Sequence, residues 1–249
     1  MLLYELNFFE MLEGSLSLLW VLFSTIVGVL IILKTKSKDY VAVGIFWIFM
    51  CGGWWASSIQ FVFIISMDLY LPDEIYLLLT MLGIPWAVIL WFYVFGTFVY
   101  PKKRKMMTII YAIIAFGYQS AYIILVFAVP GFVGTRESIF STDFSAFSLI
   151  FIIFGLSSVY ASGLIFAKRS IQLNDPKVAW KGRFLLIAFT LYAIGAISDA
   201  ALSIEDLIFN SLITIITRTL LVISGILFYF SFFLPDSLAK KLVKGAESS

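Results

Sequence analysis

The chain of 249 residues contains no histidine and a single cysteine. Without imidazole there is neither a Ser–His catalytic pair nor a histidine-ligated metal site, and with only Cys51 there is no internal disulfide. Charged residues make up 13% of the chain, whereas 62% of the residues are hydrophobic and the mean hydropathy is +1.04. This composition lies outside the range of soluble domains and predicts an integral membrane protein.

Apolar runs long enough to cross a hydrocarbon core of about 30 Å recur along nearly the whole chain. We expect seven spans, at residues 14–33, 40–66, 75–99, 107–129, 145–167, 183–204 and 208–234. The predicted fold class is an all-α membrane protein, a bundle of seven transmembrane helices that forms one domain over residues 1–236. Residues 237–249 are expected to form a short amphipathic tail on the inner membrane surface.

The charges between these spans separate into two groups. Fifteen of the seventeen Lys and Arg residues follow the first, third, fifth and seventh spans, and the other connections are acidic. The positive-inside rule then places the amino terminus outside and the carboxyl terminus in the cytoplasm. Two of these basic stretches run from Lys102 to Lys105 and from Lys168 to Arg183. We expect them to dock a cytoplasmic signalling partner, with membrane lipids as the other partner and no nucleic acid.

Small and polar residues recur at helical spacing within every span, so each helix has an inward face. One interpretation is close helix packing with hydrogen bonds across it. The other is a cavity open to the outside. Its expected lining consists of aromatic and amide side chains of spans two to four, namely Trp54, Trp55, Trp86, Tyr118, Gln119 and Tyr122.

Prolines and glycines predict the irregular points of the chain. Pro85, just after Gly83, is expected to kink the third span near its middle. The outer connection 131–144 is the longest on its side, and it forms either a lid over the cavity or a plain solvated loop.

Two charges lie deep inside apolar sequence, Asp199 in the sixth span and Arg218 in the seventh. Each costs about 2.5–3.5 kcal/mol at the centre of a lone membrane helix, so packing or function has to compensate for it. Asp199 lies roughly 7–8 Å and Arg218 roughly 12–16 Å from the outer ends of their helices, and their side chains tilt toward each other. We expect an ion pair, with hydrogen bonds from Ser198, Thr214 and Thr217. The pair either closes the bundle or binds a ligand.

Several known classes of seven-helix protein do not fit the residues. Membrane hydrolases of the ceramidase type need histidines to hold zinc. Rhodopsins need a lysine in the last span, where this chain has Arg218, whose guanidinium does not form a Schiff base. Neither a phosphate-binding glycine loop nor a nucleophile elbow is found. We therefore expect a protein that is not an enzyme, with no cofactor, no metal and no catalytic residue.

One part of the chain carries a resemblance. The Phe46–Trp47 and Trp54–Trp55 pairs, the turn at 68–74 and the stretch LLLTMLGIPWAVILWFYVFGTFVYPKKRK at 77–105 resemble the seven-helix sensor region at the amino end of some prokaryotic histidine kinases. In that family a small residue and a proline also interrupt the third span. The resemblance covers about 60 residues and implies a receptor module that acts on a separate partner, or one whose output domain lies outside this chain.

Three functions are compatible with these observations. The first is a sensor or receptor-like module in a prokaryotic plasma membrane, which binds a small or lipid-like ligand and signals through its basic cytoplasmic face. The second is a small-solute transporter, because spans one to three and five to seven share an order of basic and acidic connections that fits a three-plus-one-plus-three repeat. The third is a structural accessory subunit.

Overall fold

The computed structural model describes residues 6–35, 37–201 and 207–247. This described part of the chain is helical apart from one short hairpin and its connections. Its elements are α1 (Phe8–Lys34), α2 (Lys38–Met50), η1 (Cys51–Trp54), α3 (Trp55–Met67), α4 (Asp73–Leu82), α5 (Ile84–Val99), η2 (Pro101–Lys103), α6 (Arg104–Ala128), η3 (Pro130–Phe132), β1 (Gly134–Arg136), β2 (Thr142–Phe144), α7 (Ala146–Ile171), α8 (Pro176–Ala201), α9 (Leu207–Phe232) and α10 (Asp236–Glu247).

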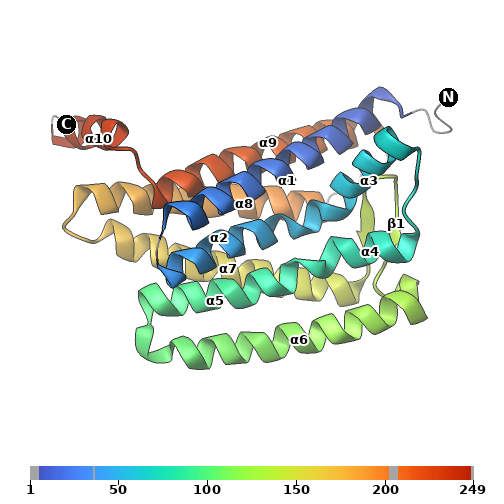
Figure 1. Cartoon of the computed structure of the whole chain (residues 1–249), viewed down its shortest axis with the longest axis horizontal. Coiled ribbons are helices and arrows are strands. Elements are labelled where there is room, and N and C mark those ends of the chain that lie inside the picture. The colour runs from blue at the N-terminus through green and yellow to red at the C-terminus, as the bar shows by residue number, and fades with distance from the viewer. Residues whose placement is uncertain (1–5, 36, 202–206, 248–249) are drawn as a thin grey trace.

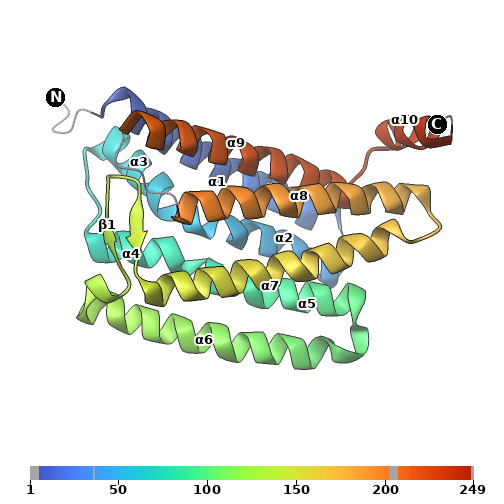
Figure 2. The same ribbon diagram turned by 180° about the vertical axis from the view of Figure 1, so that it is seen from behind.

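Within the described residues, seven helical segments are long and apolar enough to cross a membrane, as the sequence predicts. They run along the long axis of the molecule in Figures 1 and 2. The start of α1, the α3–α4 connection and the hairpin lie at one end, which we call the hairpin end. The α5–α6 and α7–α8 turns and α10 lie at the other, the basic end. The structure therefore gathers the acidic and the basic connections at opposite ends of a multi-pass membrane bundle.

Several helix boundaries differ from the expected ones by a few residues, and the starts of α1 and α8 differ most. The first span begins at Phe8, earlier than the expected residue 14, because Asn7 and Glu10 form a capping box. The sixth span was expected to begin at residue 183, but α8 starts at Pro176, so the basic stretch 168–183 is mostly helix. Lysines near a helix end keep their ammonium groups at the membrane interface, and they do not mark the helix boundary.

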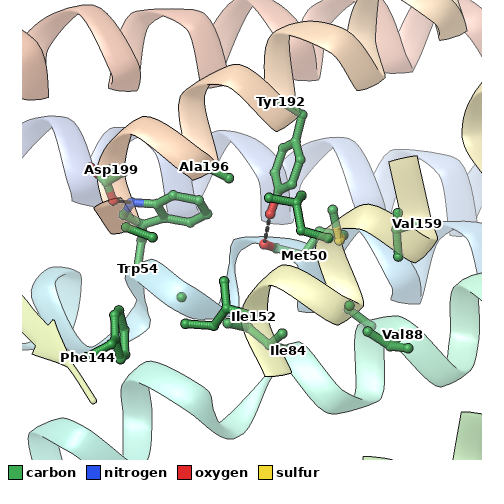
Figure 3. Close-up of a pocket in the computed structure, with 15 residues that line it drawn as sticks. Met50, Trp54, Ile84, Val88, Phe144, Ile152, Val159, Tyr192, Ala196 and Asp199 are labelled. Atoms are coloured by element: carbon green, nitrogen blue, oxygen red, sulfur yellow. Dashed lines mark hydrogen bonds between the residues drawn. The ribbon is translucent and has the colours of Figure 1, made fainter. Parts of the chain in front are cut away.

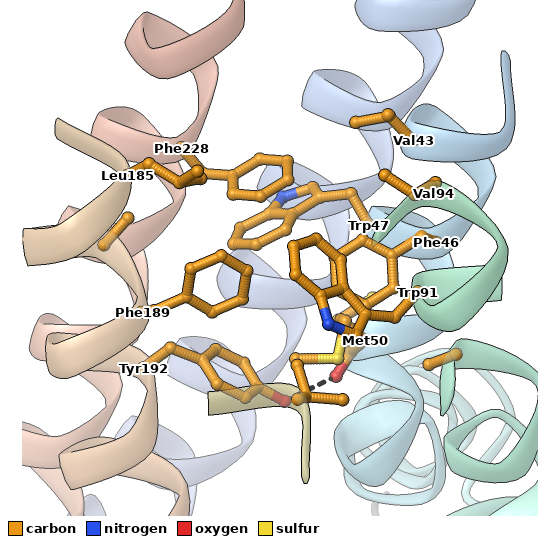
Figure 4. Close-up of a cluster of buried hydrophobic side chains, with 14 of the residues drawn as sticks. Val43, Phe46, Trp47, Met50, Trp91, Val94, Leu185, Phe189, Tyr192 and Phe228 are labelled. Atoms are coloured by element: carbon orange, nitrogen blue, oxygen red, sulfur yellow. Dashed lines mark hydrogen bonds between the residues drawn. The ribbon is translucent and has the colours of Figure 1, made fainter. Parts of the chain in front are cut away.

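The core of the bundle is aromatic. Trp47 of α2 stacks on Phe228 of α9 with 3.8 Å between ring centroids, and Phe189 of α8 packs edge-on against Trp91 of α5 at 4.8 Å (Figure 4). Trp91 also donates a hydrogen bond of 2.7 Å from its indole nitrogen to the Ser162 hydroxyl. In lipid, where apolar surface alone does not drive helices together, such packing and hydrogen bonding hold them in place.

Two spans are broken at the same depth. The second consists of α2 and α3 joined by the 3-10 turn η1, and the third is interrupted at Gly83 between α4 and α5. A Cβ placed on Gly52 would lie 2.7 Å from the Cα of Gly83, so only glycine permits this crossing. The break near Pro85 was expected from the sequence, but the break at η1 was not.

The connection 131–144 forms an antiparallel hairpin, β1 paired with β2, which the all-α prediction does not contain. Arg136 fixes it to the bundle: the guanidinium donates to the carbonyls of Leu71 (3.1 Å) and Ile139 (2.7 Å) and lies against the Tyr76 ring at 4.1 Å. Ser57 of α3 donates to the Phe140 carbonyl at 2.7 Å. The connection is thus a docked cap at the hairpin end.

At the basic end α10 extends away from the bundle (Figure 1). Lys177 of α8 and Asp236 of α10 join the two helices through an ion pair of 2.6 Å. The hydrogen bond and the positive charge of Lys177 lower the pKa of the Asp236 carboxyl below its usual value.

Candidate functional site

The ion pair between Asp199 of α8 and Arg218 of α9 is present. Nη2 of Arg218 lies 3.2 Å from Oδ1 of Asp199. The side chain of Arg218 is 4% exposed and that of Asp199 is 21% exposed, so the arginine is the more deeply buried charge. The two helices follow each other in the chain and pack side by side, which brings the two charges to the same depth.

A third residue completes this group. The indole nitrogen of Trp54 donates to Oδ2 of Asp199 at 2.8 Å, and the guanidinium of Arg218 lies 5.4 Å from the centroid of the Trp54 ring. Trp54 is the last residue of η1, so the break in the second span is what turns its ring toward α8 (Figure 3). Both carboxylate oxygens of Asp199 therefore have a partner, Oδ1 in Arg218 and Oδ2 in Trp54. We call Trp54, Asp199 and Arg218 the triad.

The triad forms one wall of a pocket at the hairpin end, which we call the polar pocket. The space between its lining side chains, counted out to the open mouth, is about 730 Å³. Its other walls come from α1, α3, α4 and the hairpin. Besides the triad, the lining carries three carboxylates, Glu13, Glu137 and Asp143.

A second pocket adjoins the first and shares Trp54, Phe144 and Asp199 with it; the space between its lining side chains, again counted out to the open mouth, is about 700 Å³. We call it the apolar pocket, because its remaining lining is mainly aliphatic side chains of α5, α7 and α8 (Figure 3). Tyr192 also lines it and donates its hydroxyl to the Met50 carbonyl at 2.9 Å. The two pockets together offer a polar and an apolar compartment that meet at the triad.

The expected hydroxyl partners of the pair are only partly in place. Ser198 and Thr214 line the polar pocket beside the triad. Thr217 does not bond to the pair, because its hydroxyl donates to the Thr214 carbonyl one turn earlier in the same helix, at 2.9 Å. A buried threonine in a helix satisfies its hydroxyl locally in this way.

Two tryptophans expected in the cavity lie elsewhere. Trp55, next to Trp54, packs against Phe49 with ring centroids 5.6 Å apart and does not line either pocket. Trp86 is 40% exposed and packs edge-on against Phe116 on the outer surface of α5 and α6. Neighbouring residues of a helix face different directions, so only one of an adjacent pair reaches a given cavity.

The α6 residues Tyr118, Gln119 and Tyr122 also lie apart from both pockets. Tyr122 donates to the Leu77 carbonyl at 2.8 Å, and Tyr118 stacks on Phe151 at 3.8 Å. The two tyrosines pack α6 against α4 and α7, and none of the three residues lines the polar or the apolar pocket. The helix α6 lies at the periphery of the bundle, because only 22% of the most apolar stretch of this span is buried inside the protein.

Sequence reasoning missed the acidic lining of the polar pocket. In the sequence, Glu13, Glu137 and Asp143 are three of the acidic residues on the outer side, and their positions indicate topology alone. The available signal was the density of acidic residues in the connection 131–144 and near the start of the chain. Their convergence depends on how the hairpin folds back over α3, which helical periodicity does not describe.

Comparisons with known proteins give no further guide to this site. No family model matches the chain, and no curated protein matches it. Among the residues that the structure describes, no group of three or more Cys, His, Asp or Glu side chains is placed to hold a metal ion. A functional assignment therefore has to come from the triad and the two pockets.

Proposed function

We propose that this protein is a membrane receptor that binds a small or lipid-like ligand in the polar and apolar pockets and signals at its basic end. The observation that carries the proposal is the incomplete hydrogen bonding of the buried Arg218 guanidinium. Its side chain is 4% exposed and lines the polar pocket, yet Nε and Nη1 have no hydrogen-bond partner among the residues that the structure describes. A buried donor without a partner costs about 1–3 kcal/mol, and more when it is charged, so a ligand that supplies acceptors gains that free energy.

The arrangement of the two ends supports a receptor. The polar pocket opens at the hairpin end, whereas the basic residues lie at the opposite end. With the positive-inside rule, the ligand arrives from outside a prokaryotic plasma membrane, and a cytoplasmic partner docks on 102–105 and 168–183. The resemblance to the sensor region of histidine kinases agrees with this direction of signalling.

A transporter is the second candidate, and the two broken spans favour it. Helices interrupted near mid-membrane often form transport sites, and here η1 and Gly83 meet at the level of the apolar pocket. A transporter exposes its site alternately to both sides, whereas a receptor exposes it to one side.

Thiol accessibility in proteoliposomes distinguishes the two. Single cysteines replace Ser141 and Ser198 in the polar pocket and Ser170 at the basic end, in a Cys51→Ala background. We expect a membrane-impermeant maleimide to modify Ser141→Cys and Ser198→Cys from one face only, and Ser170→Cys from the other. Modification of Ser198→Cys from both faces at comparable rates contradicts the receptor and supports the transporter.

A further inference from the structure

The charges that line the polar pocket select for a positive group. Asp199 forms an ion pair with Arg218, whereas Glu13, Glu137 and Asp143 form none with any residue that the structure describes. The nearby Arg136 is engaged elsewhere, with Asp73 at 3.4 Å and with two carbonyls. Glu137 and Asp143, which are exposed, attract a cation and repel an anion at the pocket mouth.

A cation alone does not satisfy the pocket, because of Arg218. Its Nη2 binds Asp199, but Nε and Nη1 lack acceptors among the described residues, and the side chain is 4% exposed. A guanidinium pairs best with a group that offers two oxygens, such as a phosphate or a carboxylate. The ligand therefore needs an acceptor group at the level of the triad, deeper than its positive charge.

Beyond the triad the cavity turns apolar. Ala87, Val88, Ile152, Leu156 and Val159 line the apolar pocket, which begins at Trp54 and Phe144 (Figure 3). Burying an alkyl chain there gains roughly 0.8 kcal/mol for each CH₂ group removed from water. From mouth to interior, the cavity thus has carboxylates, then the guanidinium of Arg218, whose buried Nε and Nη1 lack acceptors among the described residues, and then an apolar chamber.

We propose that the ligand is a zwitterionic amphiphile whose ammonium group, acceptor group and alkyl tail follow one another in that order, as in a phosphoethanolamine lipid with one chain. The ammonium lies among Glu13, Glu137 and Asp143, the phosphate accepts from Nε and Nη1 of Arg218, and the tail enters the apolar pocket. This inference names the ligand class for the proposed receptor and rests on it.

The test is native mass spectrometry of the full chain in maltoside micelles, with ligands that differ in one part at a time. Lysophosphatidylethanolamine carries all three parts. Lysophosphatidylglycerol of the same tail lacks the ammonium, an alkyltrimethylammonium of the same tail lacks the acceptor, and O-phosphoethanolamine lacks the tail. We expect one lysophosphatidylethanolamine per protein, retained at least tenfold more than any of the other three.

Substitutions then locate the bound molecule. Glu137→Gln combined with Asp143→Asn should reduce the preference for lysophosphatidylethanolamine over lysophosphatidylglycerol at least fivefold. Arg218→Lys, which keeps the charge but not the fork of donors, should weaken lysophosphatidylethanolamine more than the alkyltrimethylammonium. Glu74→Gln, at the same end but outside the pocket, is the matched control and should change neither.

The outcomes separate this inference from the proposed function. Equal retention of lysophosphatidylethanolamine and lysophosphatidylglycerol, unchanged by the pocket substitutions, identifies a surface lipid and overturns the ligand class. Arg218-dependent binding of the alkyltrimethylammonium alone also overturns the class, but leaves a receptor with a cationic ligand. If Arg218→Lys does not change the binding of any amphiphile, both the ligand class and the proposed receptor site are wrong.

Discussion

Removing one partner of the Asp199–Arg218 pair tests the energetic role of the triad. At 3.2 Å the two charges attract each other by about 5 kcal/mol if the effective dielectric constant is about 20. Desolvation of the deeply buried guanidinium offsets a large part of that attraction. We therefore expect a coupling free energy of about 2–3 kcal/mol between Asp199→Asn and Arg218→Gln in a double-mutant cycle.

The two single substitutions should differ. Asp199→Asn leaves the guanidinium, 4% exposed, without its counter-charge and should cost about 3–5 kcal/mol of unfolding free energy. Arg218→Gln leaves a carboxylate that is 21% exposed and still accepts from Trp54, so it should cost about 1–3 kcal/mol. Asp199→Asn should cost more than Arg218→Gln because the charge that it leaves unpaired, that of Arg218, is the more deeply buried one.

Steric trapping in micelles provides these unfolding free energies, with Glu74→Gln as the control for loss of an acid at the same end. Additive effects in the double mutant, or an Arg218→Gln cost larger than that of Asp199→Asn, refute the reasoning.

Two further changes test the contacts around the triad. Trp54→Phe keeps a ring but removes the 2.8 Å bond to Asp199, so it should lower the unfolding free energy by about 1.5–3 kcal/mol in the same assay. Gly52→Ala places a Cβ 2.7 Å from the Cα of Gly83 and should cost about 1–3 kcal/mol. The control Gly117→Ala, with nothing within 4 Å of the new Cβ, should be neutral or stabilise the helix by up to about 1 kcal/mol. Equal effects of the two glycine substitutions contradict the close crossing of the broken spans.

The sequence predicts the membrane bundle and the ion pair for the same reason. Apolar runs of spanning length have few alternative structures in lipid, and a charge inside such a run needs a partner. Asp199 and Arg218 lie on consecutive helices, so depth along each helix was enough to pair them. The break near Pro85 was likewise expected, because proline removes a backbone donor and disturbs a helix locally.

The rest of the site depends on contacts between distant segments. Trp54 reaches Asp199 through the turn η1, for which the Gly52–Gly53 pair is the local signal, but that signal does not show which way the Trp54 ring points. Helical periodicity also did not distinguish Trp54 from Trp55, or show that Trp86 faces outward on α5. The acids of the polar pocket converge only once the hairpin docks through Arg136, a long-range arrangement that local patterns do not encode.

Whether the hairpin end communicates with the basic end is the most direct test of a receptor. Spin labels at Lys103 after α5 and Lys168 on α7, both exposed, report the distance between these helices in a Cys51→Ala background. We expect lysophosphatidylethanolamine to shift the distance distribution measured by double electron–electron resonance in the otherwise unsubstituted protein, but not in Arg218→Lys. A distribution that stays unchanged while the ligand is bound would contradict the proposed receptor.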